Sequence, residues 1–421
     1  MKNSSGTSKS ANVWTGGARG FAMEPDACFP TDYTDARARF LATCEGLGVT
    51  TTPYPNPNRG PLNEALFTDT AWFGSADAGR VIVLVSSTHG AEGFCGCGAQ
   101  MDWLTTGGPE HLPEGVAVLI VHVINPHGFA WLRRTTEEGV DLNRNWIDFE
   151  EPLPENPGFA ELADVLLPRE IEGPVFEAAE ASIKAWRQTR DEDTFQIARG
   201  AGQYTHPGHF NFGGVEPTWA RRTLETIAAE NRLAERDIVA VVDYHTGQGP
   251  FGYGEPICGN LPGTLGNARA KAWYGESITE PTLGTSTSVP KTGLSEYGWT
   301  RMVGESLVYV ALEFGTYDPE NGRRVLRQDY WLHLYGKPDW QGQETRRIKA
   351  DIRKRYYPDT DDWRQMVLFR SRQIIKQALA GLTGDLSQRT SLPIRDISLA
   401  QRGTRAGASE GTELPKKNGP G

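Results

Sequence analysis

The strongest constraint on the fold comes from four short runs of almost unbroken apolar residues, rich in valine and isoleucine. They cover residues 80–87, 116–125, 238–246 and 307–316. Such runs are typical of strands buried on both faces, as in a parallel sheet covered by helices. Residues 65–74 alternate between apolar and polar side chains, as expected for a further strand. These five segments predict the strands of a central sheet.

Helices are predicted around these strands. They are expected at residues 32–47, 93–104, 159–190, 216–235, 342–355 and 361–383. Buried strands that alternate with helices predict an α/β fold with a mostly parallel central sheet. We interpret the proline-rich residues 51–61 as a connector and residues 141–150 as a loop. Residues 246–300 are rich in Gly, Thr and Ser and form a long stretch, so part of them is expected to line an active site.

The length of 421 residues allows one large α/β domain or two smaller ones. We predict a single domain at residues 21–385, in which residues 150–235 and 246–300 carry insertions or active-site loops. Residues 1–20 are polar and rich in Gly and Ser, so a flexible N-terminus is expected there. Residues 386–421 are polar and rich in Gly, Pro and Lys, which predicts a disordered tail.

Composition limits the classes of binding partner and the cellular compartment that we expect for this chain. The formal net charge of −10 argues against nucleic acid as a partner, since phosphate binding needs a basic surface. No run approaches the roughly 20 apolar residues of a membrane span, and the first residues lack the apolar core of a secretory signal. The odd set of five cysteines suggests reduced thiols. Those cysteines are Cys28, Cys44, Cys95, Cys97 and Cys258. We therefore expect a cytoplasmic protein without a membrane partner.

Histidine and glutamate side chains end three of the predicted strands. His89 and Glu92 follow the first apolar run and stand three residues apart, His245 closes the third run, and Glu313 closes the fourth. Ligands of such sheets bind at the carboxyl ends of the strands, where all four residues fall. Two histidines and one glutamate are a typical catalytic zinc set that leaves one position open for water. Glu313 is then available as a general base.

The alternative for each of these residues is a structural role. An isolated His-x-x-Glu is a weak pattern, and a single histidine is more often structural than a metal ligand. His122, inside a predicted strand, is expected to be such a core histidine with a polar partner. The shared position at a strand end favours the metal interpretation for His89 and His245.

A second group of polar residues lies at 133–146, with the sequence RRTTEEGVDLNRNW. Asn143 and Arg144 offer neutral and charged donors, and an arginine can bind a carboxylate with two parallel hydrogen bonds. Arg134 can offer positive charge to a developing oxyanion. The alternative is a solvated loop held by surface ion pairs. A solvated loop explains less well why Asn143, Arg144 and Asn145 place several hydrogen-bond donors next to the apolar Trp146.

Together these motifs resemble the zinc carboxypeptidase family, and more narrowly a bacterial branch of it. The resemblance rests on HGAE at 89–92, GVDLNRNW at 139–146, DYHT at 243–246 and ALEFGT at 311–316, and it extends over residues 81–316. It implies an eight-stranded mixed sheet between helices and one zinc ion per chain. It also implies hydrolysis of an amide bond next to a free carboxylate.

The resemblance also implies roles for individual residues. The implied zinc ligands are His89, Glu92 and His245, and the implied general base is Glu313. The pair that holds the substrate carboxylate corresponds to Asn143 and Arg144. The arginine that polarises the substrate carbonyl corresponds to Arg134, with Arg133 as a substitute. The family also uses a tyrosine from a mobile loop, for which the interval before the base offers Tyr253, Tyr274 and Tyr297.

The sequence therefore predicts a zinc-dependent hydrolase acting on a small peptide or N-acyl amino acid that carries a carboxylate. The insertion at 150–235 is expected to narrow the entrance to the site. The alternative is a deacylase of N-acyl amino acids, similar to succinylglutamate desuccinylase and aspartoacylase, which share the metal set and the DLNR element. A non-catalytic binding module would show damaged ligands or a damaged base, and these positions are intact.

Overall fold

The computed structural model of the chain describes residues 25–384. The predicted flexible N-terminus at 1–20 and the predicted tail at 386–421 lie outside the described residues. The described chain up to Thr383 belongs to one compact unit. The domain limits at 21 and 385 stay a prediction.

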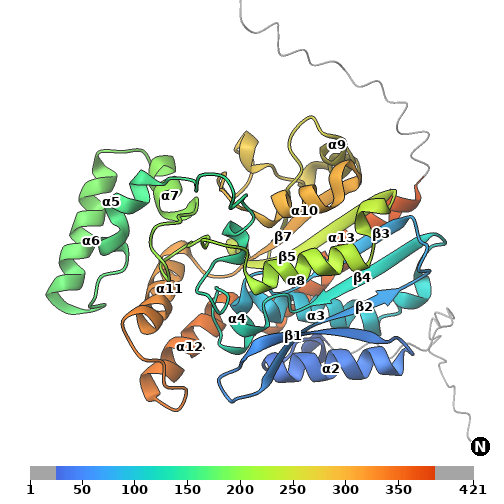
Figure 1. Cartoon of the computed structure of the whole chain (residues 1–421), viewed down its shortest axis with the longest axis horizontal. Helices are drawn as coiled ribbons and strands as arrows, with labels where there is room; N and C mark the ends of the chain where they lie inside the picture. Colours follow the sequence, from blue (N-terminus) through green and yellow to red (C-terminus); the bar gives the residue numbers. More distant parts are fainter. Residues whose placement is uncertain (1–24, 385–421) are drawn as a thin grey trace, which may run out of the picture. The chain divides into compact units, whose positions relative to one another are not determined.

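A seven-stranded mixed sheet forms the centre of the fold (Figure 1), with the order β1-β2-β4-β3-β5-β7-β6. Its strands are β1 Thr51–Arg59, β2 Ala65–Phe73, β3 Arg80–Val85, β4 Val116–His122, β5 Ile238–Phe251, β6 Gly254–Cys258 and β7 Leu307–Gly315. The four predicted apolar runs are β4, β3, β5 and β7, which pair in parallel. The remaining pairs are antiparallel. The prediction of an α/β fold with a mixed central sheet is confirmed.

The predicted number of eight strands is wrong for the described residues. Beyond β6 the chain adds only an isolated bridge between Ile257 and Thr279. Pro281 follows two residues later, and a proline has no N–H to continue a ladder of hydrogen bonds. The sheet therefore ends at β6.

The prediction of a connector at residues 51–61 is also wrong, because β1 occupies most of this segment. β1 pairs only with β2 and lies at the edge of the sheet. Its prolines are Pro53, Pro55 and Pro57, at alternate positions. Alternate residues direct their N–H groups to the same side of a strand, so the missing donors of Pro53 and Pro55 fall on one side, as an edge strand tolerates. Pro57 lies where the register with β2 shifts, between Asn56 and Arg59, and a bulge also tolerates proline.

Helices cover both faces of the sheet (Figure 1). They are α1 Pro25–Cys28, α2 Tyr33–Gly46, α3 Gly93–Thr105, α4 Pro126–Ala130, α5 Pro157–Leu166, α6 Gly173–Gln188, α7 Glu192–Gly200, α8 Trp219–Glu230, α9 Leu265–Tyr274, α10 Ser295–Val303, α11 Pro319–Leu334, α12 Gln343–Tyr356 and α13 Asp361–Thr383. Within residues 25–384, no helix has both the length and the apolar character that crossing a membrane would require.

Three predicted segments differ from the structure. The helix expected at 159–190 is broken into α5 and α6, since Pro168 and a left-handed Gly173 interrupt it. Residues 246–300 are not one long loop, because they contain β6, α9 and most of α10. Helix α11 was not predicted. Its sequence is strongly charged, yet it begins at Pro319 and is capped by Asp318, whose side chain accepts from the Asn321 N–H.

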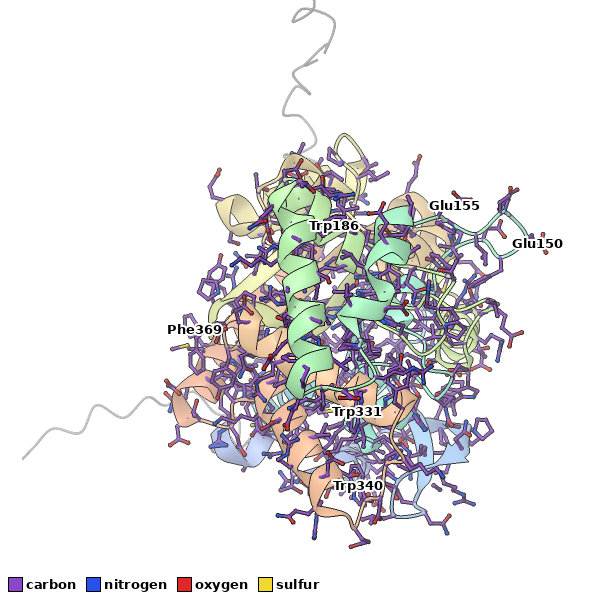
Figure 2. All side chains as sticks on the ribbon, turned by 90° about the vertical axis from the view of Figure 1, so that its left-hand side faces the viewer. Glu150, Glu155, Trp186, Trp331, Trp340 and Phe369 are labelled. Carbon is purple, nitrogen blue, oxygen red and sulfur yellow. The ribbon has the colours of Figure 1, made fainter. Side chains whose placement is uncertain are left out.

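Helices α5, α6 and α7 form a layer of their own, away from the sheet (Figure 1). They share a small apolar cluster that includes Phe159, Ile183 and Phe195. Figure 2 faces this layer, with Trp186 on α6, where the Trp186 Nε1 donates to the Glu161 carboxylate of α5 at 2.7 Å. This layer occupies much of the predicted insertion at 150–235.

One face of the sheet packs on α8 and α10 through a core that contains Trp146 and Trp299. Trp146 is fully buried and stands two residues after Arg144, one of the predicted anion-binding residues. Gly298 of α10 lies against its ring, because an added Cβ would stand 2.0 Å from the Trp146 Cε3. This contact fixes the distance between α10 and the segment that carries Arg144.

We predict that Gly298→Ala destabilises the protein by about 1–3 kcal/mol, since the buried Trp146 ring has no room to move. The matched control is Gly46→Ala in α2, where an added Cβ meets nothing within 4 Å. Alanine is the better helix former, so the control should keep or raise the urea midpoint. Equal midpoints for the two variants would contradict the prediction.

Candidate metal centre

A tight turn after β3 places His89 and Glu92 at the carboxyl end of the sheet. His89 precedes a short 3-10 helix, Gly90–Glu92, which leads into α3. An added Cβ on Gly90 would lie 2.1 Å from the carbonyl carbon of Gly128 in α4. The turn therefore needs a glycine at this point to approach α4 so closely.

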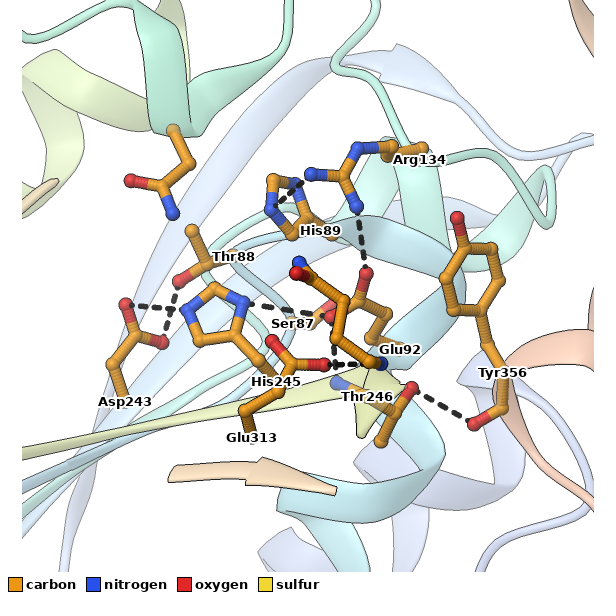
Figure 3. Close-up of polar contacts among 12 residues, drawn as sticks. Ser87, Thr88, His89, Glu92, Arg134, Asp243, His245, Thr246, Glu313 and Tyr356 are labelled. Atoms are coloured by element: carbon orange, nitrogen blue, oxygen red, sulfur yellow. Dashed lines mark hydrogen bonds and ion pairs between the residues drawn. The ribbon is translucent and has the colours of Figure 1, made fainter. Parts of the chain in front are cut away.

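The two remaining strand ends meet this turn. His245 on β5 and Glu313 on β7 are direct partners in the parallel register. One ligand atom from each of His89, Glu92 and His245 lies within 4.8 Å of the others. The three residues are 3%, 1% and 3% exposed. Figure 3 shows their side chains converging, with Glu313 beside His245. The structure thus brings together the residues predicted as zinc ligands and general base.

The glutamate of this cluster is held from two sides. The Glu92 Oε2 accepts from the Thr246 N–H at 2.9 Å, and its Oε1 accepts from the Arg134 Nη1 at 2.9 Å. The Arg134 Nη2 also donates to the His89 Nε2 at 2.7 Å. Arg134 therefore contacts two of the three candidate ligands, as Figure 3 shows. Arg133 instead faces Asp329, with 3.6 Å between its Nε and the carboxylate.

Each histidine of the cluster has a carboxylate beside one of its ring nitrogens. The Asp141 Oδ1 lies 3.3 Å from the His89 Nδ1, and the Asp243 Oδ2 lies 3.2 Å from the His245 Nε2. Such carboxylates orient histidine ligands and fix their tautomer. Both nitrogens are buried and make no well-aligned hydrogen bond within residues 25–384. The donor set, its burial and the close approach of the three side chains fit a bound metal ion.

Asp243 is a site residue that the sequence analysis missed. The Asp243 Oδ1 accepts from the Thr88 Oγ1 at 2.7 Å, and its Oδ2 accepts from the Tyr309 hydroxyl at 3.0 Å. The sequence did offer one indication of this role. Asp243 stands two residues before His245 in the same strand, and residues two apart in a strand point to the same face.

The surrounding charges act in opposite directions on the two histidines of the cluster. Burial, followed by the positive charges of Arg134 and His245, lowers the pKa of His89 well below its ordinary value. Burial acts in the same direction on His245, but the carboxylates of Asp243 and Glu92 outweigh it and raise the pKa of His245 above the ordinary value. His89 is therefore neutral, as a metal ligand must be.

The pKa of Glu313 lies near neutral pH. Burial, followed by the negative charge of Glu92, raises the pKa of Glu313 to about 7. The Glu313 Oε1 accepts from the Gln248 N–H at 3.0 Å, which orients the carboxylate. A base is most effective when its pKa lies near the working pH.

Asn143 and Arg144 lie in a 3-10 turn, Leu142–Arg144, behind Asp141. The Asn143 Oδ1 accepts from the Ser295 N–H at 2.7 Å, so its amide nitrogen is directed elsewhere. Arg144 is 2% exposed, and its guanidinium donates to the carbonyl oxygens of Asn143 and Gly200. Within residues 25–384 no carboxylate lies within 4.0 Å of this guanidinium.

The three tyrosines of the interval before Glu313 lie in different places. Tyr274 is buried at the end of α9, and Tyr253 is exposed beside β6. The Tyr297 hydroxyl donates to the Lys291 carbonyl at 3.2 Å. Burial and the charge of Glu296 raise the pKa of Tyr297, while the nearby Arg144 acts to lower it. Of these three tyrosines, Tyr297 is therefore the one whose electrostatic interactions include Arg144.

Of the remaining histidines, His122 has the core role that the sequence predicts. Its Nδ1 lies 2.8 Å from the Gln100 Oε1, and its ring stacks on Phe40. His209 is also structural, since its Nε2 meets the carbonyl oxygen of Ala163 at 3.0 Å, in the layer formed by α5 to α7.

Among solved structures, the chain is similar to carboxypeptidase A from Helicoverpa armigera. The identity is 15%, with 79% of this chain and 75% of that chain covered, and the TM-score is 0.43. It is also similar to a succinylglutamate desuccinylase from a Silicibacter species, with 15% identity, 68% and 67% coverage, and a TM-score of 0.34. No curated protein matches the chain. A family model described as "Protein of unknown function (DUF2817)" matches residues 29–370, and the chain belongs to that family.

Proposed function

We propose that the chain is a zinc-dependent hydrolase that cleaves an amide or peptide bond next to a free carboxylate. The observation that carries this proposal is the buried cluster of His89, Glu92 and His245 with Glu313 directly across the sheet from His245. A zinc ion held by the three ligands would lower the pKa of bound water to about 7 and polarise the substrate carbonyl.

The other residues have distinct tasks in this proposal. Glu313 accepts a proton from the attacking water and passes it to the leaving nitrogen. Arg134 lies against two ligands and offers its positive charge to the oxyanion that forms at the carbonyl carbon. Arg144 and the amide of Asn143 bind the carboxylate of the substrate, which gives the buried guanidinium the anionic partner that it lacks.

The same site suits a deacylase of N-acyl amino acids. Arg144 is enclosed by the backbone of Asn143 and Gly200, so the carboxylate binds at a closed end. In both activities one amino acid with a free carboxylate lies beyond the bond that is cleaved. The two activities differ in the group on the other side, which is a peptide for the carboxypeptidase and a simple acyl group for the deacylase. A panel of blocked dipeptides and N-acyl amino acids separates them.

The first test concerns the metal and the base. Elemental analysis of the purified protein should give one zinc per chain, and His245→Ala should lose it. Glu313→Gln should keep the zinc and lower turnover about 10²- to 10⁴-fold, since proton transfer is lost. The control is His111→Ala, an exposed histidine that should leave both readouts unchanged. A wild-type chain without stoichiometric zinc, or full turnover by Glu313→Gln, would overturn the proposal.

The second test concerns the substrate carboxylate. Arg144→Met should lower kcat/KM by about 100-fold for substrates with a free carboxylate, because a buried charge pair is lost. The same variant should leave kcat/KM unchanged for substrates capped as carboxamides. Arg232→Met, at an exposed arginine, serves as the control. Equal losses on free and capped substrates would show that Arg144 does not bind the carboxylate.

The third test concerns Asp243. Asp243→Asn should weaken zinc binding about 10- to 100-fold, since the carboxylate that orients the His245 ring is removed. Competition with a chelator measures this affinity. Asp237→Asn is the matched control, because Asp237 directly precedes the opposite end of the same strand and is exposed. Unchanged affinity in Asp243→Asn would contradict the positioning role.

A further inference from the structure

Lys291 lies in a segment that is fixed directly onto the predicted carboxylate-binding residues. The Gly293 carbonyl accepts from the Trp146 N–H at 3.1 Å, and the Thr292 N–H donates to the Ala201 carbonyl at 2.9 Å. The Ser295 N–H donates to the Asn143 Oδ1 at 2.7 Å. The backbone around Lys291 is thus tied to the residues that flank Arg144.

The contact with Arg144 itself is made by Gly293. Its φ is +65°, and an added Cβ would lie 2.1 Å from the Arg144 carbonyl oxygen. Glycine is the residue that tolerates both conditions. The carbonyl of Lys291, two residues before, accepts from the Tyr297 hydroxyl. Lys291 therefore has a fixed backbone next to Arg144.

The ammonium of Lys291 is only partly satisfied. Its Nζ donates to the Ser288 Oγ at 2.6 Å, and an ammonium has three protons to donate. Within the described part of the chain, no carboxylate lies within 4.0 Å of this nitrogen. Burial, followed by the charges of Arg144 and Arg134, lowers the pKa of Lys291 to about 7. The positive charges of Arg144 and Arg134 thus disfavour the protonated form of Lys291.

The carboxyl groups that face Lys291 are engaged elsewhere or uncharged. Asp141 is bound to Arg134, with 3.3 Å between the carboxylate and the Nε. Glu313 accepts from the Gln248 N–H. Burial raises the pKa of Glu296 to about 8, so this group is mostly protonated at neutral pH. Arg144 is therefore a cation without a carboxylate partner, and Lys291 beside it is about half protonated at neutral pH. A bound anion would favour the charged form of Lys291 and offset the repulsion between the two groups.

We propose that Lys291 is a specificity-determining residue that binds a second carboxylate of the substrate, while Arg144 binds the first. The substrate class is then an amide of an acidic amino acid, with aspartate or glutamate beyond the cleaved bond. This inference rests on the proposed function and extends it by naming that amino acid. A substrate with a neutral side chain would leave the ammonium without an anion.

The test uses two pairs of probes that differ in one carboxylate. They are hippuryl-L-glutamate with hippuryl-L-glutamine, and N-acetyl-L-glutamate with N-acetyl-L-glutamine. In the pair that the enzyme cleaves, we expect about 100-fold higher kcat/KM for the glutamate member, since the glutamine member leaves the partly buried ammonium without an anion. Lys291→Met should remove this preference by slowing the glutamate member and leaving the glutamine member unchanged.

Two further variants make the result specific. Lys291→Arg retains the positive charge and should keep most of the preference, which a general defect in folding would not allow. Lys271→Met, at a lysine of α9 that is paired with Glu280 at 2.7 Å, should keep the wild-type preference. Calorimetry gives a readout without turnover: free L-glutamate should bind the wild type more tightly than L-glutamine, and Lys291→Met should abolish the difference.

The outcomes distinguish this inference from the proposed function. Cleavage of both members at equal rates by the wild type would overturn the role of Lys291 and leave the hydrolase intact. Equal losses on both members in Lys291→Met would place Lys291 on the same carboxylate as Arg144, which also overturns it. A chain that cleaves no amide but still prefers glutamate in calorimetry would overturn the proposed function and support the second carboxylate site.

Discussion

The parallel register of β3, β5 and β7 is the constraint on which the rest of the site depends. Val85 at the end of β3 pairs with Asp243, and His245 pairs with Glu313. These pairings set the height at which each polar side chain leaves the sheet. A slip of one residue would turn the side chain of His245 to the opposite face. The side chains of these strands are buried on both faces, so a slip would have to repack the helices on both sides of the sheet.

At the ends of these strands, buried side chains of opposite charge lie close together. Glu92, Asp141 and Asp243 bring negative charge to the two histidines, and Arg134 returns positive charge to Glu92 and Asp141. A metal ion bound by the three ligands would add to the positive side of this balance. Arg144 and Lys291 stand outside it, since neither is paired with a carboxylate in the described residues. In the proposals made above, their charge serves to bind the carboxylates of a substrate.

The sequence predicts the centre of the fold better than its periphery, for a physical reason. Strands such as β3 and β5 are buried on both faces, so their composition alone identifies them. The edge strand β1 needs no apolar run and carries prolines, so its composition resembles that of a connector. Helix α11 is recognised by its cap rather than by its composition.

The same distinction applies to the site. His89, Glu92, His245 and Glu313 could be placed together, because each follows an apolar run and parallel strands end at one edge. Lys291 could not be, since it lies outside the strands and its position depends on contacts with Trp146 and Ala201, distant in sequence. The contact between Arg134 and two candidate ligands likewise depends on the folded turn after β3.

The prolines of β1 have a consequence for how molecules of this protein meet. A sheet edge with free N–H groups can recruit a strand from another molecule and so begin aggregation. In the edge strand β1, three of the nine positions are prolines and offer no N–H donor. At the opposite edge, the N–H of Cys258 and the carbonyl of Pro256 are already bonded to Thr279. Both margins of the described sheet are thus poor templates for a strand added from another molecule.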